Sequence, residues 1–163
     1  MAGLNRAAWV ILLLAVGTRA AAQTVLPLAG VNAVGVEVES PGKDLPQVFT
    51  ATRLQTLIEL KLRGAGLRVL PIALLTNPIV QLSVIGGPVL GQRGSSLGFV
   101  FGATMSARQY LVWPKNGAVA PLELWANSYV VTSDSGGAAA ELERLVGILL
   151  DELINEWLKA NPR

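Results

Sequence analysis

Apolar residues recur along this chain at two different periods, and the order of those periods limits the folds that it can adopt. Val34, Val36 and Val38 alternate with glycine and glutamate, which is the period of a β-strand with one buried face. Residues 45–63 repeat apolar residues every three or four positions, which predicts an amphipathic helix from Leu45 to Arg63. The same period returns over residues 138–160 and predicts a second, C-terminal helix. The apolar positions of the two helices are Ala51, Leu54, Ile58 and Leu62, and Leu142, Val146, Leu149, Leu153 and Trp157.

Residues that favour helix ends flank the first helical pattern. Asp44 is a candidate N-cap, with Gln47 three positions later to complete a capping box. Gly64 or Gly66 is expected to end the helix by adopting a left-handed backbone. The short apolar stretch Leu67–Leu70, which Pro71 interrupts, predicts a short strand after the helix.

The segment between the two helices is β-prone. Residues 79–85 predict a strand, and Gly86–Gly98, with five glycines and a proline, predicts an irregular loop. Residues 99–113 predict one long strand, Pro114–Gly117 predicts a turn, and residues 122–131 predict the antiparallel partner strand. We therefore expect an α+β fold, a two-layer sandwich with both amphipathic helices on one face of a mostly antiparallel sheet of four to five strands.

The N-terminal residues have the pattern of an export signal. Arg6 precedes an apolar run over residues 8–16, and Ala20–Ala22 supplies small residues for cleavage. We expect a signal peptide over residues 1–22, cleavage after Ala22, and a single α+β domain over residues 23–163. The run is about half of the roughly 20 apolar residues that span a bilayer, so cleavage is favoured over a retained anchor, the alternative that stays open. No later segment is a better membrane span.

The composition excludes several kinds of chemistry. The chain has no histidine and no cysteine, so catalysis by a histidine base or a thiolate is excluded, and so are disulfides, zinc ribbons and iron–sulfur clusters. A lipid anchor on a cysteine after the cleavage point is excluded for the same reason. The absence of cysteine is also more typical of a bacterial envelope than of a eukaryotic secretory route. Without residues 1–22 the basic and acidic residues are equal in number, so no nucleic-acid partner is expected.

Two patterns bear on catalysis. Gly94–Gly98 matches the G-x-S-x-G pattern of a hydrolase nucleophile, but no histidine is present and a strand is expected to follow, so we interpret it as a Gly/Ser loop. Glu37 and Glu39 share one strand face and are the first candidates for a carboxylate-dependent hydrolase or carbohydrate-active enzyme. A solvated edge strand explains the pair better. No catalytic residue, metal ligand or cofactor is therefore predicted.

Aromatic and apolar side chains are the stronger candidates for a binding site. Trp113 and Trp125 are expected near the ends of paired strands, in a cluster that closes one end of the sheet, either as core residues or as a contact surface. Tyr110 and Tyr129 lie close to them in the sequence. In the glycine-rich segment, Val89, Leu90 and Arg93 are the second candidate contact, because glycines allow a loop to adapt to a partner. The list of candidate binding residues is Val89, Leu90, Arg93, Trp113 and Trp125.

The C-terminal third resembles a recurrent class of small uncharacterised exported bacterial α/β proteins. The resemblance rests on Leu124-Trp125, on the polar turn after Val131, and on the stretch from Leu153 to Pro162. The layout of elements is also similar to that of the lipopolysaccharide-assembly lipoprotein and of the N-terminal domain of the Tol-system propeller protein. The chain departs from that lipoprotein because it lacks the lipid-bearing cysteine. The resemblance assigns no functional residue.

The sequence predicts an exported protein of the bacterial periplasm, or a secreted one, that is not an enzyme. Its expected role is binding, or assistance in assembly, toward an envelope protein partner or an apolar, lipid-like ligand. A carboxylate-dependent enzyme is the alternative. The identity of the partner and the oligomeric state stay open at this point.

Overall fold

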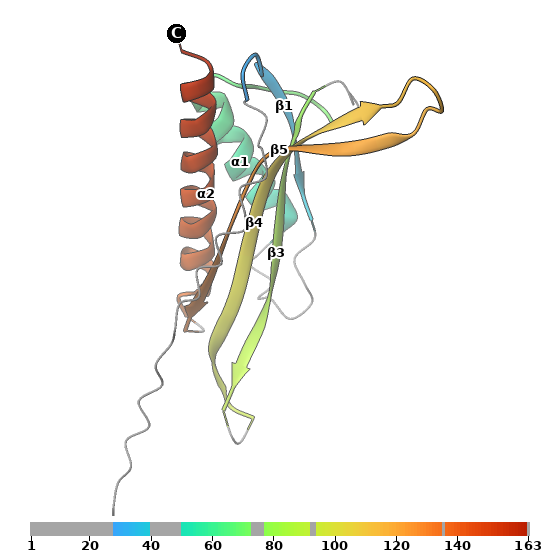
Figure 1. Ribbon diagram of the computed structural model, residues 1–163. Helices are drawn as coiled ribbons and strands as arrows, with labels where there is room; N and C mark the ends of the chain where they lie inside the picture. Colours follow the sequence, from blue (N-terminus) through green and yellow to red (C-terminus); the bar gives the residue numbers. More distant parts are fainter. Residues whose placement is uncertain (1–27, 40–49, 73–76, 92–93, 135, 163) are drawn as a thin grey trace, which may run out of the picture.

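Two helices and five strands make up the chain in the computed structural model, which describes residues 28–39, 50–72, 77–91, 94–134 and 136–162 (Figure 1). The elements, in chain order, are β1 (Ala33–Val38), α1 (Ala51–Ala65), β2 (Arg68–Val69), β3 (Ile79–Leu90), β4 (Ser96–Val112), β5 (Val119–Ser133) and α2 (Ala138–Ala160). The predicted signal peptide lies outside the described residues. No helix among the described residues is long and apolar enough to cross a membrane.

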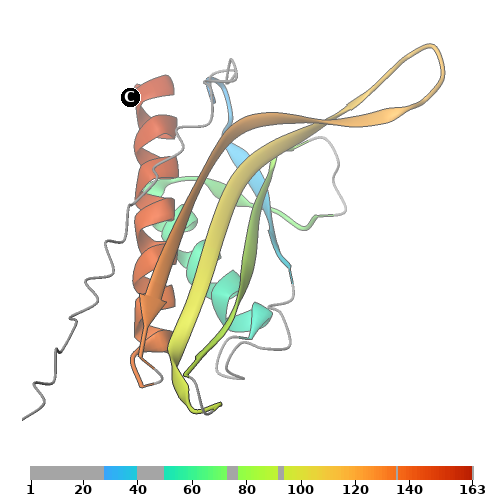
Figure 2. The same ribbon diagram turned by 60° about the horizontal axis from the view of Figure 1, so that its bottom comes forward.

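The five strands form one sheet in the order β2-β1-β3-β4-β5. β1 pairs in parallel with β2 and β3, whereas β3, β4 and β5 pair antiparallel. Both helices lie on the same side of this sheet (Figures 1 and 2). The α+β sandwich with a mostly antiparallel sheet is therefore confirmed.

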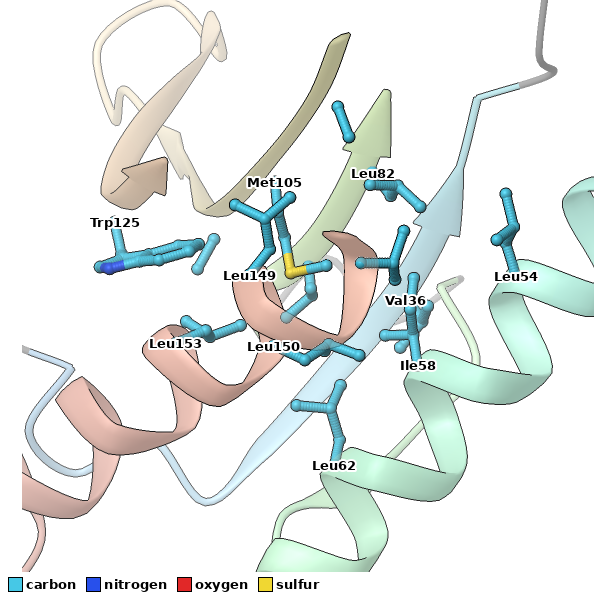
Figure 3. Close-up of a cluster of buried hydrophobic side chains, with 14 of the residues drawn as sticks. Val36, Leu54, Ile58, Leu62, Leu82, Met105, Trp125, Leu149, Leu150 and Leu153 are labelled. Atoms are coloured by element: carbon cyan, nitrogen blue, oxygen red, sulfur yellow. The ribbon is translucent and has the colours of Figure 1, made fainter. Parts of the chain in front are cut away.

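Alternate residues of the strands face the helices and form the core between the two layers (Figure 3). Val36, Leu82 and Met105 supply this face of the sheet, and each is almost completely buried. The helical residues packed against them are Leu54, Ile58, Leu62, Leu142, Val146, Leu149, Leu150, Leu153 and Trp157. The helical positions predicted from the sequence period are thus the buried ones, apart from Ala51 at the first turn of α1.

The two helices run parallel to each other. Lys61 of α1 contacts Asp151 of α2 at 2.8 Å, and eight residues earlier in each helix Arg53 contacts Glu143 at 2.5 Å. The Lys61 ammonium also donates to the carbonyl of Gly147 at 3.3 Å. Because these pairs are solvent-exposed, they contribute orientation more than stability.

The start of α1 differs from the prediction. Thr50 has an extended backbone, and its Oγ1 accepts a hydrogen bond from the backbone N–H of Arg53, so the helix begins at Ala51 instead of Leu45. The proposed cap Asp44 lies outside the described residues. At the other end Gly66, with φ of 101°, is the C-cap, which confirms one of the two predicted glycines. The bounds of α2 match the prediction.

The loop predicted over Gly86–Gly98 is wrong for much of its length. β3 continues to Leu90, and Gly86, Gly87, Pro88 and Val89 pair with residues of β4. Gly86 lies opposite Phe101 with no room for a Cβ atom, because one placed there would lie 2.7 Å from the Phe101 Cα. This glycine permits close strand approach rather than an irregular loop.

β4 and β5 form a long hairpin with one irregularity. Ala107 pairs with Trp125 and Arg108 pairs with Glu123, so Leu124 is an extra residue in β5. Both Leu124 and Trp125 are buried. The chain reverses after Trp113, as predicted, and the ribbon projects beyond the rest of the sheet (Figures 1 and 2).

Candidate binding surfaces

Trp125 belongs to the hydrophobic core. Its side chain is 9% exposed and lies beside Met105 and Leu153 in the layer between sheet and helices (Figure 3). Leu124 at the bulge and Trp125 both belong to the core cluster. Of the two interpretations of this tryptophan, core packing is therefore the one that the geometry supports.

Trp113 lies far from Trp125, at the tip of the β4–β5 hairpin, and is 60% exposed. Leu111, Val112 and Val119 beside it are also exposed. The expected cluster of Trp113 and Trp125 at one end of the sheet is thus wrong, because five ladder pairs separate them along the ribbon. Trp113 remains available for contact with a partner.

Tyr129 lies on the face of β5 that points toward α2, although its side chain is partly exposed. Its hydroxyl donates to one carboxylate oxygen of Glu152 at 2.5 Å, and Asn127 Nδ2 donates to the other at 2.6 Å. The hydrogen bond to Glu152, followed by partial loss of hydration and the Glu152 charge, raises the pKa of Tyr129 above its ordinary value. These three side chains link β5 to α2, and no pattern in the sequence indicates this link.

Val89 and Leu90 lie at the end of β3, in the hairpin that β3 forms with β4, and both are exposed. Arg93, the third candidate of this segment, lies outside the described residues. Leu97, which sequence reasoning did not single out, is 66% exposed on the same hairpin. Its signal was present, since Leu97 is an apolar residue flanked by serine and glycine.

An open hollow of about 310 Å³ lies beside this hairpin. Its lining residues are Val89, Leu97, Gly98, Phe99, Thr132, Ser133 and Asp134. Gly98 has φ of 150° and lies against the Ser133 carbonyl, where any side chain would collide. The close approach of β4 and β5 at this glycine shapes the floor of the hollow.

The two groups of candidate residues lie at opposite ends of β4. The strand has 17 residues, and at roughly 3.3 Å per residue it separates its ends by up to about 55 Å. Val89 and Leu90 therefore do not share a site with Trp113. Within the described part of the chain, each of the two hairpins therefore carries its own exposed apolar residues.

The carboxylates do not gather around either end. Glu39 accepts a hydrogen bond from Gln81 at 2.9 Å, and Gln81 in turn accepts one from Arg108 at 2.7 Å, in a polar chain on the sheet face away from the helices. Among the described residues no group of three or more acidic side chains is placed to hold a metal ion. Glu37 lies on the same face, at the neighbouring alternate position of β1.

The interior also has a small apolar void. It measures about 10 Å³ and lies among Val34, Leu67, Ala107, Leu153 and Trp157. Such a space holds at most about one water molecule, and it is far below the roughly 300 Å³ of small ligand pockets. This part of the core therefore does not hold an acyl chain.

Among known proteins, this chain shows similarity only to solved structures. No family model matches the chain, and no curated protein matches it. A PelC dodecamer structure from Paraburkholderia phytofirmans is 18% identical, with 82% of this chain and 94% of that chain covered and a TM-score of 0.45. Lipoprotein GNA1162 from Neisseria meningitidis is 20% identical over 76% and 96% of the two chains, with a TM-score of 0.36.

A third similar structure is the rare lipoprotein B from Shewanella oneidensis, 14% identical over 79% of this chain and 92% of that chain, with a TM-score of 0.29. The similar structures thus include bacterial lipoproteins. The layout resemblance to the Tol-system domain and to the lipopolysaccharide-assembly lipoprotein stays a prediction. All three TM-scores are below 0.5, so these similarities assign no function to this chain.

Proposed function

We propose that this chain is an exported, non-enzymatic binding protein of the bacterial cell envelope, which holds an apolar segment of an envelope protein at the β3–β4 hairpin. The export signal expected over residues 1–22 supports the envelope location, in the periplasm or outside the cell. An assembly-accessory role is one form of such binding.

The hollow beside the β3–β4 hairpin is the observation that carries the proposal. Its apolar side is made of Val89, Leu97 and Phe99, and its polar side of Thr132, Ser133 and Asp134. Apolar residues beside polar ones are the usual composition of a protein–protein contact. A volume of about 310 Å³ accommodates one or two partner side chains. Leu90, exposed next to it, extends the apolar contact.

The charges near the hollow also favour a partner segment that is not strongly basic. Asp134 is the only carboxylate among the lining residues of the hollow. The sequence has no other aspartate or glutamate near the hairpin, since none occurs from residue 60 to residue 122. The hairpin therefore offers apolar area with Arg93 as the single charged residue between Val89 and Phe99. Burial of such area contributes about 25 cal/mol per Å² to the hydrophobic term.

The test is capture of a partner that depends on these residues. The full chain with a C-terminal tag is expressed in its own host, and the proteins that co-purify from gently solubilised envelopes are identified by mass spectrometry. The same experiment is done with a Leu90→Ser/Leu97→Ser double variant, and with Leu60→Ser as the matched control. Leu60 is an exposed leucine on α1, away from the hollow.

We expect one envelope protein in stoichiometric amount with the wild-type chain and with the Leu60 variant, and its loss with the double variant. The captured protein is then purified, and titration with the three chains should give a dissociation constant raised at least tenfold by the double substitution. Equal capture by all three chains would contradict the assigned surface. Turnover of a substrate that Glu37→Gln abolishes would instead favour the enzymatic alternative.

A further inference from the structure

Among the residues that the structure describes, no strand pairs with the last part of the β4–β5 hairpin on either side. β3 begins at Ile79, opposite Arg108, so β4 and β5 continue beyond this point as a two-stranded ribbon. Tyr110 pairs with Pro121, and the ladder runs on to the pair Val112–Val119. The turn is closed by the Trp113 N–H, which donates to the Ala118 carbonyl at 2.8 Å. Residues 110–121 are called the ribbon tip below (Figure 2).

Both faces of the ribbon tip carry exposed apolar side chains. Val112 and Val119 are directly paired and share one face, whereas Leu111 and Trp113 alternate with Val112 and lie on the other. All four are exposed. A two-stranded ribbon is marginally stable in water by itself, and clustered exposed apolar residues mark an interaction site. The ribbon tip therefore needs a surrounding that removes both faces from water.

The charge of the ribbon tip selects the kind of surface it meets. Lys115 lies exposed at the turn, and the tip has no carboxylate, because the sequence has none from residue 60 to residue 122. Tryptophan and lysine together are the residues that prefer the interface of a membrane, where the indole lies at headgroup level and the amine meets lipid phosphates. A cation without nearby carboxylates is complementary to an anionic surface.

We propose that the ribbon tip docks on the surface of a membrane that contains anionic phospholipid. A flat protein surface covers one face of a ribbon, whereas the headgroup region surrounds an inserted tip and removes both faces from water. Trp113 and the two valines enter this region, and Lys115 contacts the lipid phosphates. The tip lies at the opposite end of β4 from the hollow assigned to a partner protein, so the two proposals fail separately.

The experiment measures flotation of the full chain, in the form that its host processes, with two kinds of vesicle. One is made of phosphatidylcholine alone, and the other also contains phosphatidylglycerol. We expect co-flotation with the anionic vesicles, and a weaker signal at high salt, because salt screens the attraction between Lys115 and the lipid phosphates. No flotation with either vesicle would overturn the proposal.

Variants locate the contact. A Val112→Ser/Val119→Ser variant should lose at least tenfold in partition to the anionic vesicles. Lys115→Gln should lower partition to the anionic vesicles about fivefold and leave partition to the neutral vesicles unchanged. Leu60→Ser, an equally exposed apolar position on α1, is the control and should float like the wild-type chain. Circular dichroism confirms that each variant is folded. Equal flotation of the tip variants and the control would overturn the proposal.

Fluorescence gives a readout specific to Trp113. Trp125 and Trp157 are buried, so quenching by brominated lipid should come from Trp113 among the described tryptophans. Trp113→Phe keeps an apolar ring, so it should retain flotation while the quenching falls. Quenching that is identical in the wild-type chain and the Trp113→Phe variant would place another residue in the membrane and overturn the assignment. A dimer that depends on the ribbon tip and forms without vesicle binding would also overturn the assignment, because the tip would then contact a second copy of the chain.

Discussion

Tyr129 of β5 donates its hydroxyl hydrogen to Glu152 of α2 across 2.5 Å. Asn127, two residues earlier on the same face of β5, donates to the other oxygen of that carboxylate at 2.6 Å. One glutamate thus joins two positions of the edge strand to the C-terminal helix. Because α2 is fixed in this way against β5, the long β4–β5 hairpin, whose two ends lie at the two candidate surfaces, has a defined position relative to the helix layer.

The first prediction concerns the pH dependence of this link. The hydrogen bond to Glu152, the loss of hydration and the Glu152 charge raise the pKa of Tyr129 above its ordinary value of 10.0. The folded state therefore favours the neutral phenol. This stabilisation is fully present below pH 10.0 and is lost as the pH rises through the raised pKa.

Tyr129→Phe should lower the free energy of unfolding by about 1 kcal/mol or less at neutral pH, because the bond lies near the surface. Urea denaturation of both proteins at neutral pH and at a series of values above pH 10.0 measures the difference. We expect the difference to shrink along the series. A difference that stays constant would show that the phenol does not donate to Glu152 in solution.

The second prediction separates the two tryptophans of the hairpin. Trp125→Ala removes a large side chain from the core and should cost about 3 kcal/mol of stability. Trp113→Ala removes an exposed side chain and should change stability by about 0.5 kcal/mol or less. Thermal denaturation of the two variants checks this. Similar losses for both would contradict the burial of Trp125 and the exposure of Trp113.

The sequence predicted the layers of the fold because helix and strand periods are local properties. Leu142, Val146 and Leu149 recur at helical spacing, and the same residues are buried in α2. Register is not local. The extra residue Leu124 shifts the pairing of β5 relative to β4, which the alternation of apolar residues does not specify. The expected cluster of Trp113 and Trp125 is wrong because Trp113 lies at the turn, whereas Trp125 lies five ladder pairs away from it.

The sequence indicated which residues form the candidate surfaces, but not where in the fold these residues lie. Val89, Leu90 and Trp113 are apolar residues beside turn signals, and all three are exposed. Their separation to opposite ends of β4 depends on how far β3 and β4 extend. The glycines obscured that length, because glycine in a strand and glycine in a loop look alike in a sequence.

The third prediction concerns Asn161, which follows α2 and binds the first described residues. Its Nδ2 donates to the Leu28 carbonyl at 2.9 Å, and its Oδ1 accepts from the Gly30 N–H at 2.7 Å. Asn161→Ala should cost about 1–2 kcal/mol and speed hydrogen exchange at the Gly30 amide. Asn116→Ala is the matched control, since that side chain accepts only from Ala118 within an exposed turn. Unchanged exchange at Gly30 would contradict the contact.

The fourth prediction compares two glycines with opposite environments. Gly64 lies in α1, and a Cβ atom placed there meets nothing within 4 Å. Gly64→Ala should therefore raise the free energy of unfolding by about 0.5–1 kcal/mol, because alanine restricts the unfolded chain and favours the helix.

Gly86 has no such space, because a Cβ atom would collide with the Val100 carbonyl and lie 2.7 Å from the Phe101 Cα. Both neighbours are backbone atoms of the paired strand, so neither moves without disturbing the ladder between β3 and β4. Gly86→Ala should lower stability by about 1–3 kcal/mol. It should also weaken capture of the partner protein, because the Gly86–Phe101 pair belongs to the β3–β4 hairpin that lines the hollow. Urea denaturation of Gly64→Ala and Gly86→Ala measures the change in the free energy of unfolding. If both substitutions change it in the same direction, Gly86 lies in an ordinary loop.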